Sequence, residues 1–130
     1  MSDLLARVRN GAWLDAQVYA PLAWAVPGVL PEGFGLFTGP PKAGKSWAAL
    51  GIALAVSSGG VALGSIPVGP ARPVFFLALE DGERRLQERS RHLLGRDPIP
   101  PLFEFVTSAT PAEVLELIAA WLEQVSTAKP

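Results

Sequence analysis

One stretch of the chain decides the fold, and it is Gly39-Pro40-Pro41-Lys42-Ala43-Gly44-Lys45-Ser46. Its two glycines permit backbone angles that a side chain would forbid, so successive amide N–H groups can curl around a cluster of phosphate oxygens. Lys45 would reach the outer phosphates of a nucleotide, and the hydroxyl of Ser46 would bind a magnesium ion. The pattern therefore predicts a phosphate-binding loop for a nucleoside triphosphate, which we expect to be ATP, together with Mg²⁺.

The loop begins with two prolines, which have no N–H groups to offer a phosphate. We therefore expect the later amides, those of residues 43–47, to do most of the binding, while the prolines stiffen the entry to the loop. The predicted nucleotide-binding residues are Gly39, Pro40, Pro41, Lys42, Ala43, Gly44, Lys45, Ser46 and Trp47, with Ser46 also the predicted metal ligand.

The segments around the loop favour this interpretation over a chance match to a short pattern. Residues 34–38 are mostly apolar and predict a buried strand that runs into the loop, and residues 47–56 are apolar on nearly every face, which predicts a helix inside the core. Gly59 and Gly60 supply the end of that helix. Strand, phosphate loop and helix is the context that the motif requires.

A second apolar run, residues 74–79, predicts a strand covered on both sides, and Glu80 and Asp81 follow it directly. Ligands of parallel α/β sheets lie at this end of the strands, so Glu80 could orient and deprotonate a water molecule. Together with Lys45 it is the predicted catalytic pair. Alternatively, Glu80 or Asp81 helps to hold the magnesium ion, or both acids only favour the start of the next helix.

The rest of the chain predicts further strands and helices. Residues 3–10 suit a short helix stopped at Gly11, after which prolines break the chain into loop, and residues 61–73 suit a loop or short hairpin. A charged helix over 83–94, with Leu86, Leu93 and Leu94 facing inward, precedes a strand over 102–106. Thr110 to Glu113 form a capping box for a last helix, whose predicted inner face holds Val114, Leu117, Ile118, Trp121 and Val125.

Alternating strands and helices predict an α/β fold with a parallel three-layer α/β/α core. We expect an N-terminal arm over residues 1–32 and the core over residues 33–130.

Composition excludes several classes of site. The chain has 130 residues, no cysteine and one histidine, so disulfides, thiolate metal sites and histidine clusters are ruled out. The formal charge of -1 gives no general attraction to nucleic acid or an anionic membrane.

The arginines of residues 84–96 alternate with acids, which favours a solvated, salt-bridged face with His92 on the surface. The absence of a signal core and of a long apolar run predicts a cytoplasmic protein without a membrane partner.

Residues 24–33, 39–47 and 74–86 together resemble the RecA-type AAA family ATPases, and within them the RepA-like hexameric helicases. The form Gly44-Lys45-Ser46-Trp47 and the strand end Leu79-Glu80-Asp81 occur together at the spacing of that family. The resemblance implies a RecA-like core, ATP hydrolysis with magnesium, and homo-oligomeric rings around single-stranded DNA in replication or recombination. It also implies that Glu80 is the catalytic glutamate.

The family continues beyond the last helix into a strand that ends in a magnesium-binding aspartate, whereas this chain stops at Pro130. The resemblance therefore implies a fragment or a truncated core, in which residues 1–130 alone should have negligible turnover. Two alternatives stay open: a nucleotide kinase or other P-loop phosphotransferase, for which no arginine-rich lid is evident, and a non-catalytic nucleotide-binding module.

Overall fold

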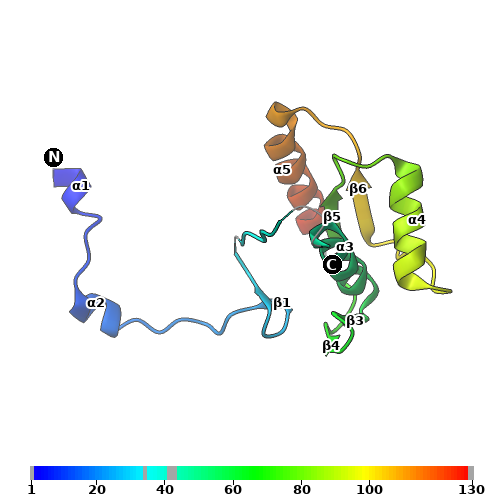
Figure 1. The fold of residues 1–130 in the computed structure, drawn as a ribbon. Coiled ribbons are helices and arrows are strands. Elements are labelled where there is room, and N and C mark those ends of the chain that lie inside the picture. Colours follow the sequence, from blue (N-terminus) through cyan, green and yellow to red (C-terminus); the bar gives the residue numbers. More distant parts are fainter. Residues whose placement is uncertain (1, 34, 41–43, 129–130) are drawn as a thin grey trace.

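The computed structural model describes residues 2–33, 35–40 and 44–128 (Figure 1). Helices and strands follow in the order α1 (Ser2–Leu5), α2 (Gly11–Asp15), β1 (Trp24–Val26), β2 (Leu30–Pro31), α3 (Lys45–Ser58), β3 (Val61–Ala62), β4 (Ile66–Pro67), β5 (Val74–Leu77), α4 (Glu83–Leu94), β6 (Phe103–Val106) and α5 (Pro111–Ala128). None of the described helices is long and apolar enough to cross a membrane.

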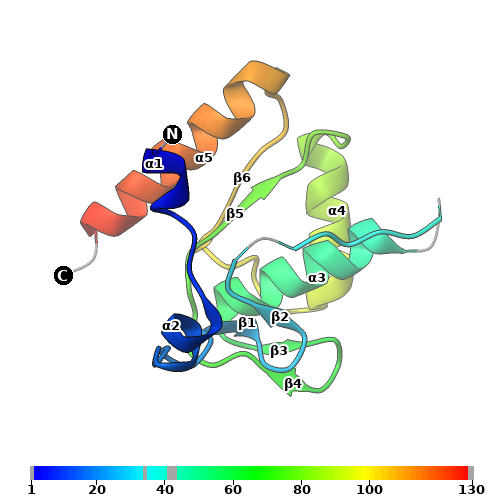
Figure 2. The same ribbon diagram turned by 90° about the vertical axis from the view of Figure 1, so that its left-hand side faces the viewer.

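Strands β5 and β6 form the centre of the fold. They pair in parallel, in a register that sets Phe76 opposite Phe105. Helices α4 and α5 lie on opposite sides of this pair in both ribbon views (Figures 1 and 2). The mixed α/β fold with parallel strands is thus confirmed. Among the described residues the parallel sheet has two strands, so the complete three-layer core stays a prediction.

The side chains of β5 alternate between its two faces, which explains why both faces are covered. Phe75 stacks on Trp121 of α5 with ring centroids 5.4 Å apart, whereas Phe76 points to the other face and meets Phe103 at 5.6 Å. Successive side chains of a strand point to opposite faces, so an unbroken apolar run needs an apolar partner on each side. The predicted strand over 74–79 is confirmed in its first four residues.

Among the described elements, helix α3 carries the largest share of the buried side chains. One side of it packs against β5, β6 and α4 in a cluster of Leu50, Ala53, Leu54, Ala78, Leu86 and Phe103. Another side packs against β1 and the β3–β4 hairpin in a cluster of Val26, Ala55, Val56, Ala62 and Val68. The expected helix inside the core is therefore confirmed. Its all-round apolar surface is explained by neighbours on several sides.

Gly59 ends α3 for a steric reason. Its φ of 72° lies in the left-handed region, and a Cβ there would stand 2.8 Å from the backbone nitrogen of Ala71. A residue with a side chain would meet both strain and a clash at this point. The helix stop predicted at Gly59 is confirmed. Of the two alternatives predicted for residues 61–73, a loop or a short hairpin, the structure has the hairpin, β3–β4.

The last two helices begin and end close to where the sequence placed them. Helix α4 has the predicted bounds, with Leu86 buried and Leu94 packed against the core. Leu93 is exposed, contrary to prediction, and borders a cavity. Helix α5 starts with the predicted capping box: the Thr110 N–H donates to Glu113 Oε1 at 2.8 Å. Its predicted inner face is half-buried throughout.

The segment ahead of the phosphate loop differs from prediction. Phe34 lies outside the described residues, and residues 35–40 form no helix or strand. Leu36 is 82% exposed and Phe37 is 67% exposed. A strand is held by ladder hydrogen bonds to a neighbour, and β5 pairs here with β6 and not with this segment. The prediction of a buried strand over 34–38 is therefore wrong for its described part.

The N-terminal region also differs. The helix predicted over 3–10 ends at Leu5, and Gly11 opens α2 instead of stopping a helix. The cause is local, since the side chain of Asn10 accepts the Trp13 N–H at 2.8 Å and so caps α2. The region predicted as loop contains the β1–β2 hairpin. Arg72 holds this hairpin to the core through the carbonyls of Trp24 and Ala25, at 3.2 and 2.9 Å.

Candidate functional site

The predicted phosphate-binding loop leads into the N-terminus of α3. Gly44 is the N-cap residue, with a φ of 89°, and no side chain caps the helix there. This left-handed angle is the physical reason for a glycine at that position. The first amide N–H groups of a helix have no partner within the helix, and its N-terminus favours negative charge. The start of α3 is thus suited to an anion such as a phosphate. Pro41, Lys42 and Ala43 lie outside the described residues.

Lys45 bonds to the first residue of the motif. Its Nζ donates a hydrogen bond to the carbonyl oxygen of Gly39, and the residue is half-buried. The bond therefore joins the first residue of the motif to the first residue of helix α3. To contact a phosphate, Lys45 would exchange this neutral acceptor for a charged one, and charge-assisted hydrogen bonds are the stronger kind.

The acidic end of β5 lies opposite the start of α3. A cavity of about 410 Å³ is lined by Ser46 on the helix and by Leu79, Glu80 and Asp81 after the strand. The fold therefore brings Ser46 and Glu80, which are far apart in the sequence, to one cavity. Their oxygens are of the kind that a hard divalent cation accepts. Over the described ranges, no group of three or more His, Asp or Glu residues could hold a metal ion.

Asp81 is engaged by two arginines of α4. Its Oδ2 accepts from Arg89 Nη1 at 3.0 Å, and its Oδ1 lies 3.4 Å from Arg85 Nε. Gly82, not an acid, is the N-cap residue of α4, and no side chain caps that helix. Asp81 is therefore anchored to α4 by ion pairs, which distinguishes it from Glu80.

Trp47 occupies a junction that the sequence did not reveal. The guanidinium of Arg89 lies over its ring, 5.2 Å from the centroid, and the rings of Trp47 and His92 meet in a T-shaped arrangement with their centroids 5.5 Å apart. The expected solvated face of α4 is wrong for Arg89, whose side chain is only 17% exposed. A signal did exist, because Arg85 and Arg89 are four residues apart on α4 and Asp81 stands four residues before Arg85, just ahead of the N-cap residue Gly82.

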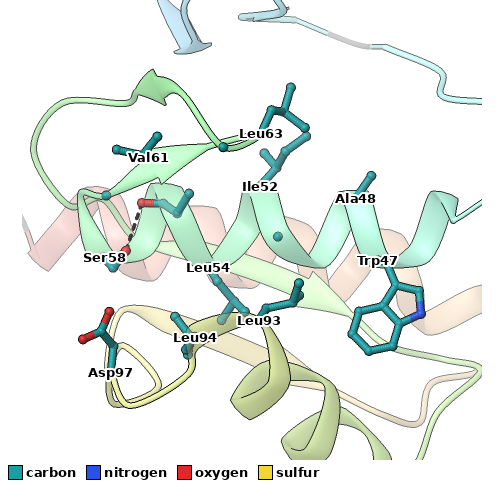
Figure 3. Close-up of a pocket in the computed structure, with 14 residues that line it drawn as sticks. Trp47, Ala48, Ile52, Leu54, Ser58, Val61, Leu63, Leu93, Leu94 and Asp97 are labelled. Atoms are coloured by element: carbon teal, nitrogen blue, oxygen red, sulfur yellow. Dashed lines mark hydrogen bonds between the residues drawn. The ribbon is translucent and has the colours of Figure 1, made fainter.

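A second cavity, of about 400 Å³, follows α3 away from the phosphate loop (Figure 3). It starts at Trp47 and continues past Ile52 and Leu54 to Ser58, with Leu63 of the β3–β4 turn and Leu93 of α4 on its sides. Leu63 has a left-handed φ of 51°. The labelled side chains are mainly apolar, and the Ser58 hydroxyl is bonded to the Ala55 carbonyl at 3.2 Å. This cavity offers little chemistry of its own.

The parallel strand pair, the glycine-capped helix and the acids beside it define a P-loop type of nucleotide-binding domain. A family model described as an AAA domain matches residues 5–128 of the chain. The chain therefore belongs to this AAA domain family, and it is a nucleotide-binding domain of the ATPase type with the P-loop NTPase fold. Comparison with curated proteins found no match, and neither did comparison with solved structures.

Proposed function

We propose that this chain is the ATP- and magnesium-binding part of a RecA-type AAA ATPase. One observation supports the proposal above all: Ser46, at the start of α3, and Glu80, at the end of β5, line a single cavity beside a glycine-capped helix N-terminus. A phosphate chain bound at that N-terminus would lie beside both side chains. We extend the proposal to the RepA-like helicase group, with a three-layer RecA-like core, homo-oligomeric rings and single-stranded DNA as the remote partner.

Each residue then has a distinct task. Residues 39–47 bind the phosphates, Lys45 neutralises their developing charge, and Ser46 supplies an oxygen to the ion. The magnesium ion, when bound, neutralises phosphate charge and orients the outer phosphate. Glu80 holds a water molecule and takes its proton. Asp81 has a supporting task, because its carboxylate is already paired with Arg89 and Arg85.

Lys45→Ala tests the binding half of the proposal. Removing the amine should weaken binding of adenylyl imidodiphosphate with magnesium by about 2 kcal/mol, the scale of a lost charge-assisted contact. Isothermal titration calorimetry of the parent and the variant measures it. Arg96→Ala is the matched control, since it also removes one positive charge but does not line the cavity. Equal affinity of parent and Lys45→Ala would contradict the assignment of a phosphate-binding loop.

Glu80→Gln tests the catalytic half. An amide can hold a water molecule but cannot accept its proton, so the variant should bind the analogue like the parent and hydrolyse ATP about a hundredfold more slowly. Single-turnover cleavage of ATP, in a protein that includes the strand expected to follow, provides the rate. Hydrolysis at the parental rate would leave Glu80 without a catalytic role. Transfer of phosphate to a nucleoside monophosphate would instead favour a phosphotransferase.

A further inference from the structure

The side chain of Arg89 contacts both halves of the proposed site. Its Nη1 donates to Asp81 at 3.0 Å, next to Glu80, and its guanidinium covers the ring of Trp47, next to Ser46. It also lines the cavity that Ser46 and Glu80 share. We propose that Arg89 is a positioning residue, which holds the acidic turn after β5 in place against the first turn of α3.

The chemistry of a guanidinium suits this double contact. Its planar fork can donate to a carboxylate in its own plane while its face lies on an aromatic ring. Both Arg89 and Asp81 have side chains only 17% exposed, so water screens their attraction far less than that of a surface pair. Arg89 and Asp81 thus form a firm link between α4 and the strand end, and Trp47 extends that link to α3.

The turn needs such a link because little else holds it. Its backbone is tied by a long hydrogen bond, from the Asp81 N–H to the Ala78 carbonyl at 3.4 Å, and Glu80 and Leu79 are exposed. Ion pairing also separates the roles of the two acids. Asp81 serves as the anchor of the turn, and the adjacent Glu80 is the acid directed to the nucleotide and its metal ion.

The inference rests on the proposed function, since it concerns how Glu80 is presented to a bound magnesium–nucleotide. Whether Glu80 acts on a water molecule or on the hydration shell of the ion, it can contribute only when held toward Ser46. Loss of Arg89 should therefore remove the part of nucleotide affinity that depends on magnesium. The part that depends on the loop alone should stay.

The test compares Arg89→Ala with Arg85→Ala. Both variants remove one arginine from α4 and one partner from Asp81, but Arg85 is 65% exposed and makes no cation–π contact with Trp47 among the described residues. Calorimetry with adenylyl imidodiphosphate, with and without magnesium, gives the gain in affinity that magnesium provides. That gain should fall by about fivefold or more in Arg89→Ala, as for a lost charge-assisted contact. In Arg85→Ala it should change by less than about twofold, as for an exposed ion pair.

A double variant distinguishes positioning from a general effect on stability. Glu80→Ala removes both side-chain oxygens, of which Gln would keep one, so it should itself lose the magnesium-dependent gain. If Arg89 acts through Glu80, the combination of Arg89→Ala with Glu80→Ala should lose no more of that gain than the worse single variant. Amide hydrogen exchange at residues 79–82 should rise in Arg89→Ala and stay parental in Arg85→Ala. Arg89→Lys keeps the charge but not the planar group, so its gain should be intermediate.

Three results would overturn the inference: a parental magnesium gain in Arg89→Ala, an equal fall in affinity without magnesium, or additive losses in the double variant. If circular dichroism shows that Arg89→Ala does not fold, a parental gain in Arg89→Lys overturns it instead. If the parent binds no nucleotide, or if Lys45→Ala binds as well as the parent, the proposed function itself fails and this inference falls with it.

Discussion

Two apolar segments of this molecule, β5 (Val74–Leu77) and residues 35–38, each run toward a turn that belongs to the proposed site. The first pairs in parallel with β6 and has aromatic partners on both faces, Trp121 on one and Phe103 on the other. The second has no ladder, and Leu36 and Phe37 point largely into solvent. The comparison shows that apolar composition does not make a strand until a neighbouring strand supplies hydrogen bonds and a helix covers the face.

The largest expected effect comes from making the same substitution, phenylalanine to alanine, in each of the two segments. Phe76→Ala removes a ring that packs on Phe103 and the main core cluster, and it should lower the free energy of unfolding by about 3 kcal/mol. Phe37→Ala removes an exposed ring and should change it by less than about 0.5 kcal/mol. Urea unfolding followed by circular dichroism measures both. Comparable losses would mean that residues 35–38 are packed in solution, as a paired strand would be.

A smaller effect is expected at two glycines, one packed against the backbone of another segment and one with open space around it. Gly59→Ala places a methyl group at a left-handed φ and against the backbone of Ala71, so it should cost about 2 kcal/mol of stability. Gly35 has open space around the site of a Cβ and no left-handed φ. Gly35→Ala should therefore stay within about 1 kcal/mol of the parent. Thermal unfolding of the two variants provides the comparison, and a neutral Gly59→Ala would contradict the tight approach of α3 to residues 69–71.

The smallest expected effect concerns the start of a helix. Helix α3 starts at Gly44 without a side-chain cap, whereas α5 starts with the bond from the Thr110 N–H to Glu113. The hydrogen bond from the Thr110 backbone, followed by that from its side chain, holds the pKa of Glu113 below its ordinary value of 4.5. A folded-state pKa below the unfolded one gives stability that is present above the unfolded pKa and is lost as pH falls through the folded pKa.

Glu113→Gln should therefore lower the melting temperature slightly at pH 7, and the difference from the parent should shrink below about pH 4.5. The group is fully exposed, so the effect is small. Melting curves of both proteins from pH 7 down to pH 3 follow it, with Glu116→Gln as a control on the same helix. A constant difference across this range would show that the Glu113 carboxylate is not linked to the start of α5.

Much of the site was predictable because its signals are local. The left-handed glycine at the start of α3 follows from the spacing of the phosphate loop, and the helix stop at Gly59 follows from its two glycines. The capping box predicted the start of α5, and the unbroken apolar run predicted β5. Each of these depends on the backbone freedom or hydrogen bonding of a few adjacent residues. The pairing of Asp81, which precedes α4, with Arg89 within α4 was not predicted, although the spacing of four residues between Asp81, Arg85 and Arg89 indicates it.

By itself the sequence determined where a glycine takes a left-handed backbone angle and where several helices start and stop. It also determined which residue types are suited to bind phosphate and magnesium. Only the tertiary structure decided that Ser46 and Glu80 share a cavity, that Arg89 joins Asp81 to Trp47, and that residues 35–38 lie outside the described sheet. The physical reason is that local geometry depends on neighbours along the chain. Burial, strand pairing and screening of charge depend on which distant segments come to lie beside a residue.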